Sequence, residues 1–194
     1  MRIISGELKG RRLLAPRGDR TRPTSDRVKE ALFSILGRPE RRGEQRFRVL
    51  DLYCGSGALA LEALSRGADE AVLVDEDREA VEVARKNLEA LEVSSRARLV
   101  RREVGATLVD LDGAFDWVFL DPPYQGGQLD RALRLLGSRD LVAGVACAEH
   151  DANNPPADSY HSLALSDRRR WGDTAVSFYR PLPAAEGPGP EAGA

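Results

Sequence analysis

The feature that most constrains the fold is an alternation of short apolar segments with stretches suited to helices, which starts at Arg48. The apolar segments read as strands at residues 49–52, 71–74, 97–100, 117–120 and 141–148. This alternation is typical of a parallel sheet, because each parallel strand needs a crossover connection that is usually a helix. We therefore expect an α/β protein whose sheet is covered by helices on both faces.

One helix and the end of the sheet can be placed from the same pattern. Residues 77–91 carry an apolar stripe, and Asp77 and Glu79 lie near the positive end of the helix that this stripe predicts. After Asp151 the alternation stops, and the stretches 162–165 and 174–179 flank a polar turn. We expect them to finish the sheet as an antiparallel pair.

The first 47 residues differ in charge from the rest of the chain. Residues 1–48 contain 14 Lys and Arg against 6 Asp and Glu, whereas the remainder contains 15 against 25. Residues 2–15 predict a hairpin with a basic tip, and Thr24 or Ser25 can cap a helix whose apolar face holds Val28, Ala31, Leu32, Ile35 and Leu36. A basic segment on an acidic body suits a polyanion, but general overuse of arginine explains the charge equally well.

These patterns predict three regions: a basic N-terminal extension at 1–47, a main domain at 48–180 and a disordered tail rich in Pro, Gly, Ala and Glu at 181–194. We expect a cytoplasmic protein, since no apolar run approaches the roughly 20 residues of a membrane-spanning helix and no signal-peptide pattern is visible. Cys54 and Cys147 lack metal-ligand spacing and predict free, buried thiols, and we expect no metal.

The junction after the first strand of this domain is a candidate cofactor site. Asp51 lies just inside the end of this strand, which runs into a loop that contains Gly55 and Gly57. Asp75 ends the next strand, where a carboxylate can accept both hydroxyls of a ribose. The glycines also fit a loose Gly-x-Gly-x-x-Ala dinucleotide pattern. Asp51 favours S-adenosylmethionine instead, because an acid there would repel a pyrophosphate and attract the methionyl amino group. A purely local role, in which Asp51 caps the following turn, is the alternative.

A second candidate site follows the strand at 117–120, which ends in Asp121, Pro122, Pro123 and Tyr124. The prolines end the strand and hold the backbone rigidly. The carboxylate of Asp121 and the carbonyl oxygen of Pro122 could accept both N–H groups of an exocyclic base amine, and Tyr124 could stack on the extruded base. These residues predict methyl transfer to an amino nitrogen. The alternative is a purely structural role, in which the segment is only a turn that ends the strand.

The chain resembles the RsmD family of bacterial methyltransferases over nearly its full length. The resemblance lies in Arg2–Gly6 with Gly10–Leu13, in the Arg-Pro-Thr segment from Arg22 to Phe33, in residues 49–68 and in Asp121–Tyr124. It implies a Rossmann-like class I methyltransferase fold with a seven-stranded, mostly parallel sheet, preceded by a hairpin and a helix. It also implies S-adenosylmethionine as donor, S-adenosylhomocysteine as product, and N2 of one guanine in 16S ribosomal RNA, of the guanine-966 type, as target.

The resemblance gives the remaining residues their expected roles. The expected partner is the assembled or assembling small ribosomal subunit, and we expect the protein to act as a monomer. The candidate RNA contacts are Arg11, Arg12, Arg22 and Arg27, although Arg27 could instead brace the active site. The sequence departs from the family at Asp75, where Glu is common, and at Glu103 and Val104, where Asn or Asp plus Ala is commoner. The expected cofactor contacts are Thr24, Asp51, Tyr53, Gly55, Gly57, Asp75, Glu103 and Val104.

Three alternatives remain at this point. A DNA amino-methyltransferase would use the same Asp121 chemistry, but such enzymes usually carry a recognition domain for which this chain has no room. A nicotinamide-dependent oxidoreductase would explain the glycine pattern, but it lacks a candidate acid or base for hydride transfer. A catalytically inactive RNA-binding assembly factor would not need Asp51 and Asp121.

Overall fold

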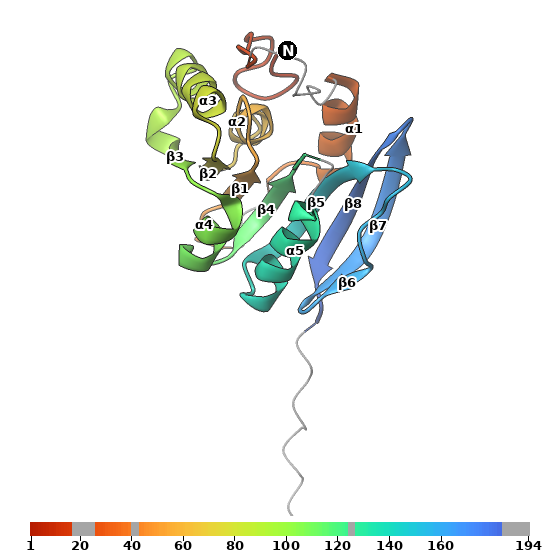
Figure 1. The fold of residues 1–194 in the computed structure, drawn as a ribbon. Coiled ribbons are helices and arrows are strands. Elements are labelled where there is room, and N and C mark those ends of the chain that lie inside the picture. Colours follow the sequence, from red (N-terminus) through yellow and green to blue (C-terminus); the bar gives the residue numbers. More distant parts are fainter. Residues whose placement is uncertain (17–25, 40–42, 124–126, 184–194) are drawn as a thin grey trace, which may run out of the picture.

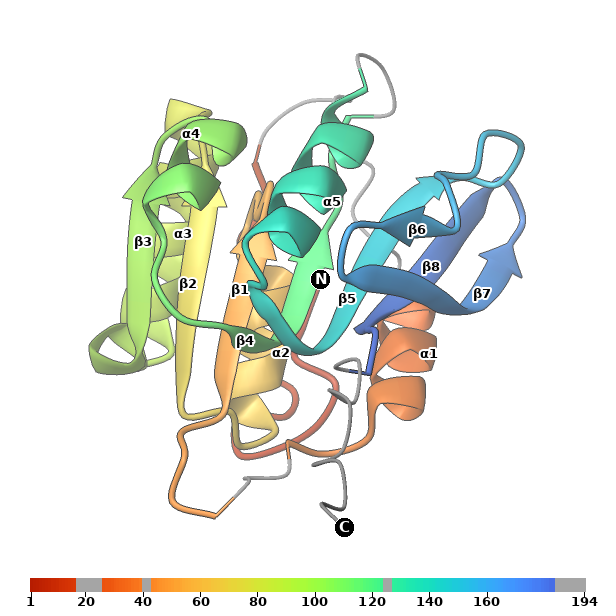
Figure 2. The ribbon, with the colours of Figure 1, turned by 90° about the horizontal axis from the view of Figure 1, so that it is seen from below.

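The computed structural model describes residues 1–16, 26–39, 43–123 and 127–183. Its centre is one sheet with the strand order β3-β2-β1-β4-β5-β8-β7-β6. The first five strands in this order pair in parallel, and β8, β7 and β6 continue the sheet in antiparallel pairing (Figures 1 and 2). The strands are β1 (Arg48–Leu52), β2 (Glu70–Asp75), β3 (Ala97–Arg101), β4 (Phe115–Leu120), β5 (Val142–Asp151), β6 (Ser159–Tyr160), β7 (Leu163–Trp171) and β8 (Thr174–Pro181).

Helices cover both faces of the sheet, as the alternation predicted. One face carries α1 (Asp26–Leu36), α2 (Ala58–Ser65) and α3 (Arg78–Ala90), and the other carries α4 (Val104–Asp110) and α5 (Gln128–Ser138) (Figure 1). A short 3-10 turn, η1 (Ser94–Arg96), precedes β3. The five parallel strands end at the same edge of the sheet, so the loops that follow them meet there.

The two hydrophobic cores explain why the strands read as continuous apolar runs. Successive side chains of a strand point to opposite faces, and both faces here are covered. In β1, Val49 packs with the α1–α3 side and Leu50 with the α4–α5 side, and both are fully buried. Trp117 packs edge-on against Phe33 and Phe47, so it is a core residue.

In the main domain and α1, the larger differences from the sequence expectations concern the strand count, β7 and the inward face of α1. The sheet has eight strands rather than seven, because the two-residue strand β6 pairs with the start of β7. Strand β7 continues to Trp171, beyond the apolar stretch at 162–165, since its polar second half pairs with β8. Ile35, which was expected on the inward face of α1, is 45% exposed, whereas Phe33 and Lys29 are buried. The buried face of α1 is therefore rotated about the helix axis by about one residue from the expected face.

The N-terminal segment folds back on itself and docks against α2. Arg2 and Arg12 form a single antiparallel bridge rather than a ladder of strands. The backbone N–H groups of Ile4 and Ser5 donate to the buried carboxylate of Glu62 at 2.7 and 3.0 Å. Gly6, with φ at 88°, lies so close to Ser65 that an added Cβ would be 1.8 Å from the Ser65 carbonyl oxygen. Only glycine fits this contact.

Cys54 and Cys147 are both free and buried, as predicted. Burial raises the pKa of each thiol, so neither is a thiolate near neutral pH. Among the described residues no helix is long and apolar enough to cross a membrane.

Candidate active site

The loop between β1 and α2 lies at the edge where the parallel strands end. Tyr53, Gly55 and Gly57 all have positive φ, at 60°, 53° and 76°. A Cβ added to Gly55 would meet no atom within 4 Å, whereas one added to Gly57 would lie 2.8 Å from the Leu73 side chain. Gly55 therefore leaves open space beside the loop, and Gly57 allows the helix to pack closely on the sheet.

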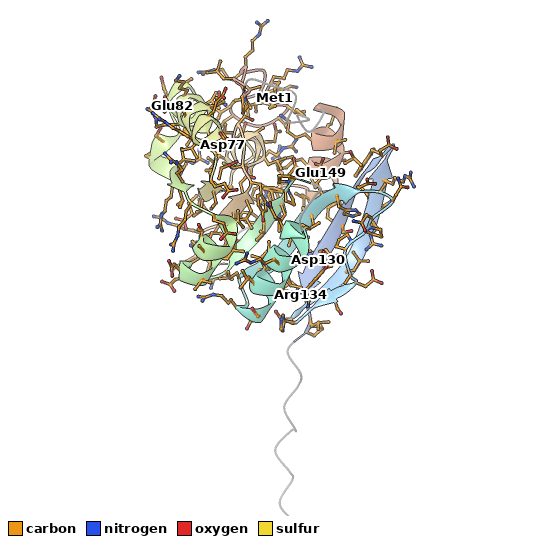
Figure 3. The ribbon with its side chains drawn as sticks, in the orientation of Figure 1. Met1, Asp77, Glu82, Asp130, Arg134 and Glu149 are labelled. Carbon is orange, nitrogen blue, oxygen red and sulfur yellow. The ribbon has the colours of Figure 1, made fainter. Side chains whose placement is uncertain are left out.

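Asp75 holds this loop against the end of β2. Its carboxylate accepts hydrogen bonds from the backbone N–H of Gly55 and from that of Asp77, both at 2.9 Å. Asp77 in turn caps α3 by accepting from Glu79 and Ala80 at 2.7 and 3.0 Å, and it stands at the start of that helix (Figure 3). The acid expected to bind a ribose thus sits half-buried beside the glycine loop, where each carboxylate oxygen retains a further lone pair.

Asp51 is almost completely buried, at 2% exposure, and accepts a hydrogen bond from the backbone N–H of Ala60 at 3.0 Å. This bond caps the first turn of α2, which is the local role considered as the alternative. Burial is the main cause that raises the pKa of Asp51 to about 8; the bond from Ala60 opposes this rise, and the negative charges of Asp121 and Asp75 contribute to it. A cation placed here would offset this cost of ionisation, so the site still suits an ammonium group.

Asp121 follows β4 directly and lies on the same side of the sheet as Asp51. The pairing of β1 with β4 puts Asp51 opposite Phe119, and Asp121 is two residues further along the same face. The neighbouring Pro122 is buried and Pro123 is exposed. Both prolines line a cleft of about 80 Å³ with the start of α5 and with residues 149–151 and 154–156. Tyr124, the expected stacking residue, lies outside the described residues.

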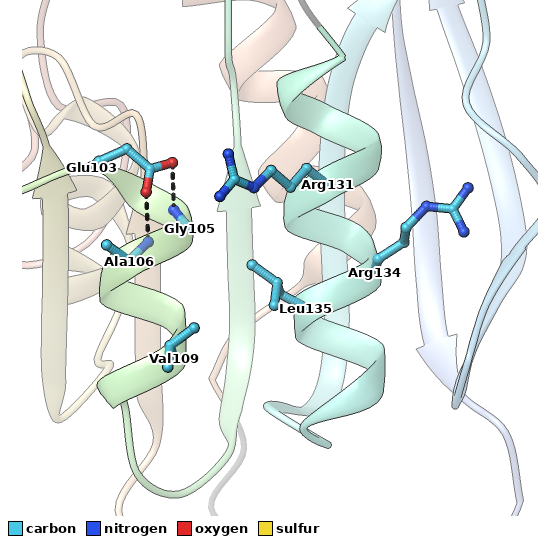
Figure 4. A pocket seen from close by; sticks show the side chains of 7 residues that line it. All are labelled: Glu103, Gly105, Ala106, Val109, Arg131, Arg134 and Leu135. Carbon is cyan, nitrogen blue, oxygen red and sulfur yellow. Dashed lines mark hydrogen bonds between the residues drawn. The ribbon is translucent and has the colours of Figure 1, made fainter.

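Glu103 and Val104, the expected cofactor contacts after β3, begin α4. The Glu103 carboxylate caps this helix by accepting from the N–H groups of Ala106 and Gly105, and these bonds lower its pKa. Its side chain is exposed, whereas Val104 is buried at 4%. An open groove of about 370 Å³ runs from Glu103 between α4 and α5, with Arg131 pointing toward Glu103 and Arg134 pointing away (Figure 4).

Tyr53 connects the glycine loop to the start of α5. Its hydroxyl donates to the carbonyl oxygen of Gln128 at 3.4 Å. Burial raises the pKa of Tyr53, and the negative charge of Glu103 adds to the rise, while that of Arg131 opposes it. The phenol is therefore neutral and a hydrogen-bond donor at physiological pH. Because the Tyr53 hydroxyl bonds to the start of α5 and Arg131 of the same helix lines the groove, the groove and the glycine loop are neighbours.

The polar groups of these residues match the hydrogen-bonding and charged groups of S-adenosylmethionine. Asp75 offers acceptor oxygens for ribose hydroxyls, Asp51 offers a carboxylate for an amino group, and the open space beside Gly55 admits a ligand against the backbone. Asp75 and Asp121 lie close enough to Asp51 for their negative charges to raise its pKa, so three carboxyl groups gather at this site. An acidic site of this kind disfavours a dinucleotide pyrophosphate and favours a cationic cofactor.

The predicted RNA-contact residues are only partly described. Arg11 and Arg12 are exposed on the N-terminal segment, and Arg11 donates to the carbonyl oxygen of Ala90 at 2.5 Å. Arg27 is the second residue of α1, but its side chain is not described. Arg22 and the expected cofactor contact Thr24 lie outside the described residues. These assignments stay predictions.

Sequence reasoning missed the buried polar residues that connect these parts. Asn87 on α3 and Glu62 on α2 are buried at 2% and 0%, and both bind the N-terminal segment. A signal was present for Asn87, because it stands inside the apolar stripe of the helix predicted at 77–91. His150 is also part of the interior: it bonds to Ser177 and to the Asp151 carbonyl oxygen at 2.8 Å each, and burial lowers its pKa.

Comparison with solved structures defines the class of protein. The chain superposes on "Putative methyltransferase yhhF" from Escherichia coli with a TM-score of 0.80 and 32% identity, which covers 93% of this chain and 97% of that one. The ribosomal protein L11 methylase of Lactobacillus delbrueckii subsp. bulgaricus, 23% identical, shares the fold with a TM-score of 0.59 over 79% of each chain. The fold is the Rossmann-like fold of class I methyltransferases.

The family follows from the sequence matches. Residues 1–180 match the family model described as "Conserved hypothetical protein 95". "Ribosomal RNA small subunit methyltransferase D" of Escherichia coli strain K12 is 39% identical over 182 residues, which covers 93% of this chain and 89% of that protein. The chain belongs to this family, and the resemblance to RsmD is confirmed.

Proposed function

We propose that this protein transfers a methyl group from S-adenosylmethionine to the exocyclic N2 of one guanine, of the guanine-966 type, in the 16S ribosomal RNA of the small subunit. The observation that carries the proposal is the placement of Asp121 and Pro122 directly after β4, which pairs with β1, the strand that contains Asp51 and leads into the glycine loop. The similarity to the small subunit methyltransferase D of Escherichia coli supports ribosomal RNA as substrate.

The acceptor chemistry follows from Asp121 and its neighbour. The lone pair of an exocyclic base amine is delocalised into the ring, so the nitrogen is a weak nucleophile. The Asp121 carboxylate and the Pro122 carbonyl oxygen would accept its two N–H groups, which aligns the amine and stabilises the positive charge that develops on it. The buried Pro122 and the adjacent Pro123 restrict the backbone, so these acceptors need little reorganisation. The bound cofactor would supply an already activated methyl group.

The cofactor residues act as binding groups in this proposal. Asp75 would accept the ribose hydroxyls, and Asp51 would face the methionyl amino group directly or through water. Tyr53 follows β1, and Glu103 and Val104 follow β3, so these three would border the adenine. The product S-adenosylhomocysteine would be held by the same groups, apart from the attraction that depends on the sulfonium charge.

The N-terminal extension would supply the RNA contact. Arg11 and Arg12 are exposed on a segment that is fixed to the body through Glu62 and Ser65. A fixed basic surface near the site would neutralise phosphates and set the register of the RNA without reading its sequence. Removing both arginines should weaken RNA binding and flatten its dependence on salt.

The test supplies labelled S-adenosylmethionine with naked small-subunit RNA, with assembled small subunits and with duplex DNA. We expect label in at least one ribosomal sample, and digestion to nucleosides should yield N2-methylguanosine. The Asp121→Ala variant should lose the activity, whereas Asp110→Asn, a change of an exposed acid on α4, should keep it. Label in DNA alone, or a fully active Asp121→Ala variant, contradicts the proposal.

A further inference from the structure

Asn87 joins two parts of the protein that are far apart in sequence. Its side chain is 2% exposed on α3. The Oδ1 atom accepts a hydrogen bond from the backbone N–H of Leu14 at 2.8 Å. The Nδ2 group donates to the carbonyl oxygen of Leu14 at 3.0 Å and to that of Ser56 at 2.9 Å. One amide therefore binds both the N-terminal segment and the glycine loop.

The chemistry of these three bonds requires an amide. The group must accept one hydrogen bond and donate two at the same time, which a carboxylate or a hydroxyl cannot do. The bond to the carbonyl oxygen of Ser56 is fully buried, and Ser56 stands between Gly55 and Gly57, the two glycines of the loop. Because buried carbonyl oxygens without partners are costly, the amide selects one conformation of the loop.

Two further contacts tie the same parts together. The Ser56 hydroxyl donates to the sulfur of Met1 at 3.5 Å, so the start of the chain touches the loop directly. Arg11 donates to the carbonyl oxygen of Ala90, which ends the helix that carries Asn87. A shift of the N-terminal segment would therefore disturb both α3 and the glycine loop.

We propose that Asn87 is a positioning residue that sets the glycine loop for cofactor binding and couples this loop to the N-terminal segment. The coupling rests on the proposed function, which assigns the loop to the cofactor and the segment to RNA. Since coupling free energy is reciprocal, RNA bound to the segment increases cofactor affinity, and the cofactor increases RNA affinity to the same extent.

The first experiment measures binding of S-adenosylhomocysteine to the free protein by calorimetry. Asn87→Asp keeps the acceptor for the Leu14 N–H group and loses both donors, so we expect the Kd to rise about tenfold. The kcat at saturating S-adenosylmethionine should change about twofold at most, because Asn87 does not touch the reacting atoms. Ser166→Ala, which removes a hydroxyl of β7 that donates to the carbonyl oxygen of Phe178, should leave both values unchanged.

The second experiment measures the coupling itself. For the wild type, saturating small-subunit RNA should lower the Kd for S-adenosylhomocysteine, and this effect should largely vanish in Asn87→Asp. A wild-type protein that binds no S-adenosylhomocysteine refutes the cofactor assignment and hence the proposed function. Normal binding and normal coupling in a folded Asn87→Asp variant refute only the role of Asn87.

A measurement on the wild type covers the case in which the variant does not fold. Exchange of the Leu14 amide hydrogen requires its bond to Asn87 to open. We expect S-adenosylhomocysteine to slow exchange in a peptide that contains Leu14 by at least about threefold, while peptides from β7 and β8 stay unchanged. Unchanged exchange at Leu14 in the saturated protein overturns the proposal.

Discussion

The ammonium nitrogen of Lys29 lies 3.8 Å from the carboxylate of Glu62, and both side chains are buried, at 1% and 0% exposure. The same carboxylate accepts from the backbone of Ile4 and Ser5 and from Arg66, while Lys29 donates to the carbonyl oxygen of Arg2 at 2.6 Å. The N-terminal segment, α1 and α2 therefore meet at the buried carboxylate of Glu62. This carboxylate fixes the position of the proposed RNA-contact segment.

Glu62→Ala should lower the free energy of unfolding by about 3–5 kcal/mol, because it removes a buried carboxylate from the Lys29 ammonium group and from two backbone N–H groups. Urea denaturation followed by circular dichroism measures this change. Glu82→Ala removes an exposed acid that pairs with Arg85 and should have little effect. Equal stabilities of the two variants would show that Glu62 does not anchor the segment.

Asp51→Asn should make the free protein more stable at neutral and higher pH. The pKa of Asp51 is raised to about 8, so the folded protein keeps a proton that the unfolded chain loses near its ordinary value of 3.8. Its contribution to stability falls as the pH rises from about 4 to 8 and is lowest above 8. We expect a gain of about 1–2 kcal/mol at pH 8 and none below pH 4, measured by urea denaturation across this range. A gain that does not depend on pH would contradict this account.

The same substitution should weaken cofactor binding while it stabilises the fold. The amide that replaces the Asp51 carboxylate would carry no charge for the methionyl amino group, so we expect the Kd for S-adenosylhomocysteine to rise by about 10- to 100-fold at pH 8. Calorimetry at several pH values checks this, because wild-type affinity should increase as Asp51 ionises and the affinity of the variant should not. Equal affinities would leave Asp51 only its capping bond to Ala60.

Asp121→Asn should lower kcat by about 100-fold, because a neutral amide stabilises the developing positive charge less than a carboxylate does. The KM for S-adenosylmethionine should stay within about threefold of the wild type, since Asp121 faces the target amine in the proposed mechanism. Methylation of small-subunit RNA at varied cofactor concentration measures both values. A selective rise in KM with unchanged kcat would move Asp121 to the cofactor site.

Alanine at the two loop glycines should have different effects. Gly55→Ala adds a methyl group to open space, so its cost in stability is limited to the strain of alanine at a φ of 53°, and it should reduce cofactor affinity more than stability. Gly57→Ala places a Cβ 2.8 Å from Leu73, so it should cost about 1–3 kcal/mol of stability. Thermal melts with and without S-adenosylhomocysteine separate the two. A larger loss of stability in Gly55→Ala would contradict the assigned open space.

Much of the parallel part of the fold could be predicted from the sequence. Strands buried on both faces give continuous apolar runs, so residues such as Leu50 and Val118 mark β1 and β4 without ambiguity. Strand β7 was harder, because its second half includes Arg168, Arg169 and Arg170 and is ordered by pairing with β8 rather than by burial. A sequence pattern does not record such partner-dependent order.

The candidate site was predictable where its residues stand at the ends of strands. Asp51, Asp75 and Asp121 could be placed together from the sequence, because the carboxyl ends of parallel strands define one edge of the sheet. Asn87 and Glu62 were missed because their roles depend on helices that pack against distant parts of the chain. The capping bonds of Asp51 and Glu103 are also hard to predict, since the same carboxylate can bind a backbone or a ligand.

The strand order has a consequence for synthesis of the chain. Strand β8 lies between β5 and β7, so β6 and β7 are linked to the sheet through a strand that is translated after them. A nascent chain can assemble β1 to β5 while β6 and β7 still lack their place in the sheet. The exposed edge of β5 is covered only when residues 174–181 have left the ribosome, so the sheet is completed late in the synthesis of the described chain.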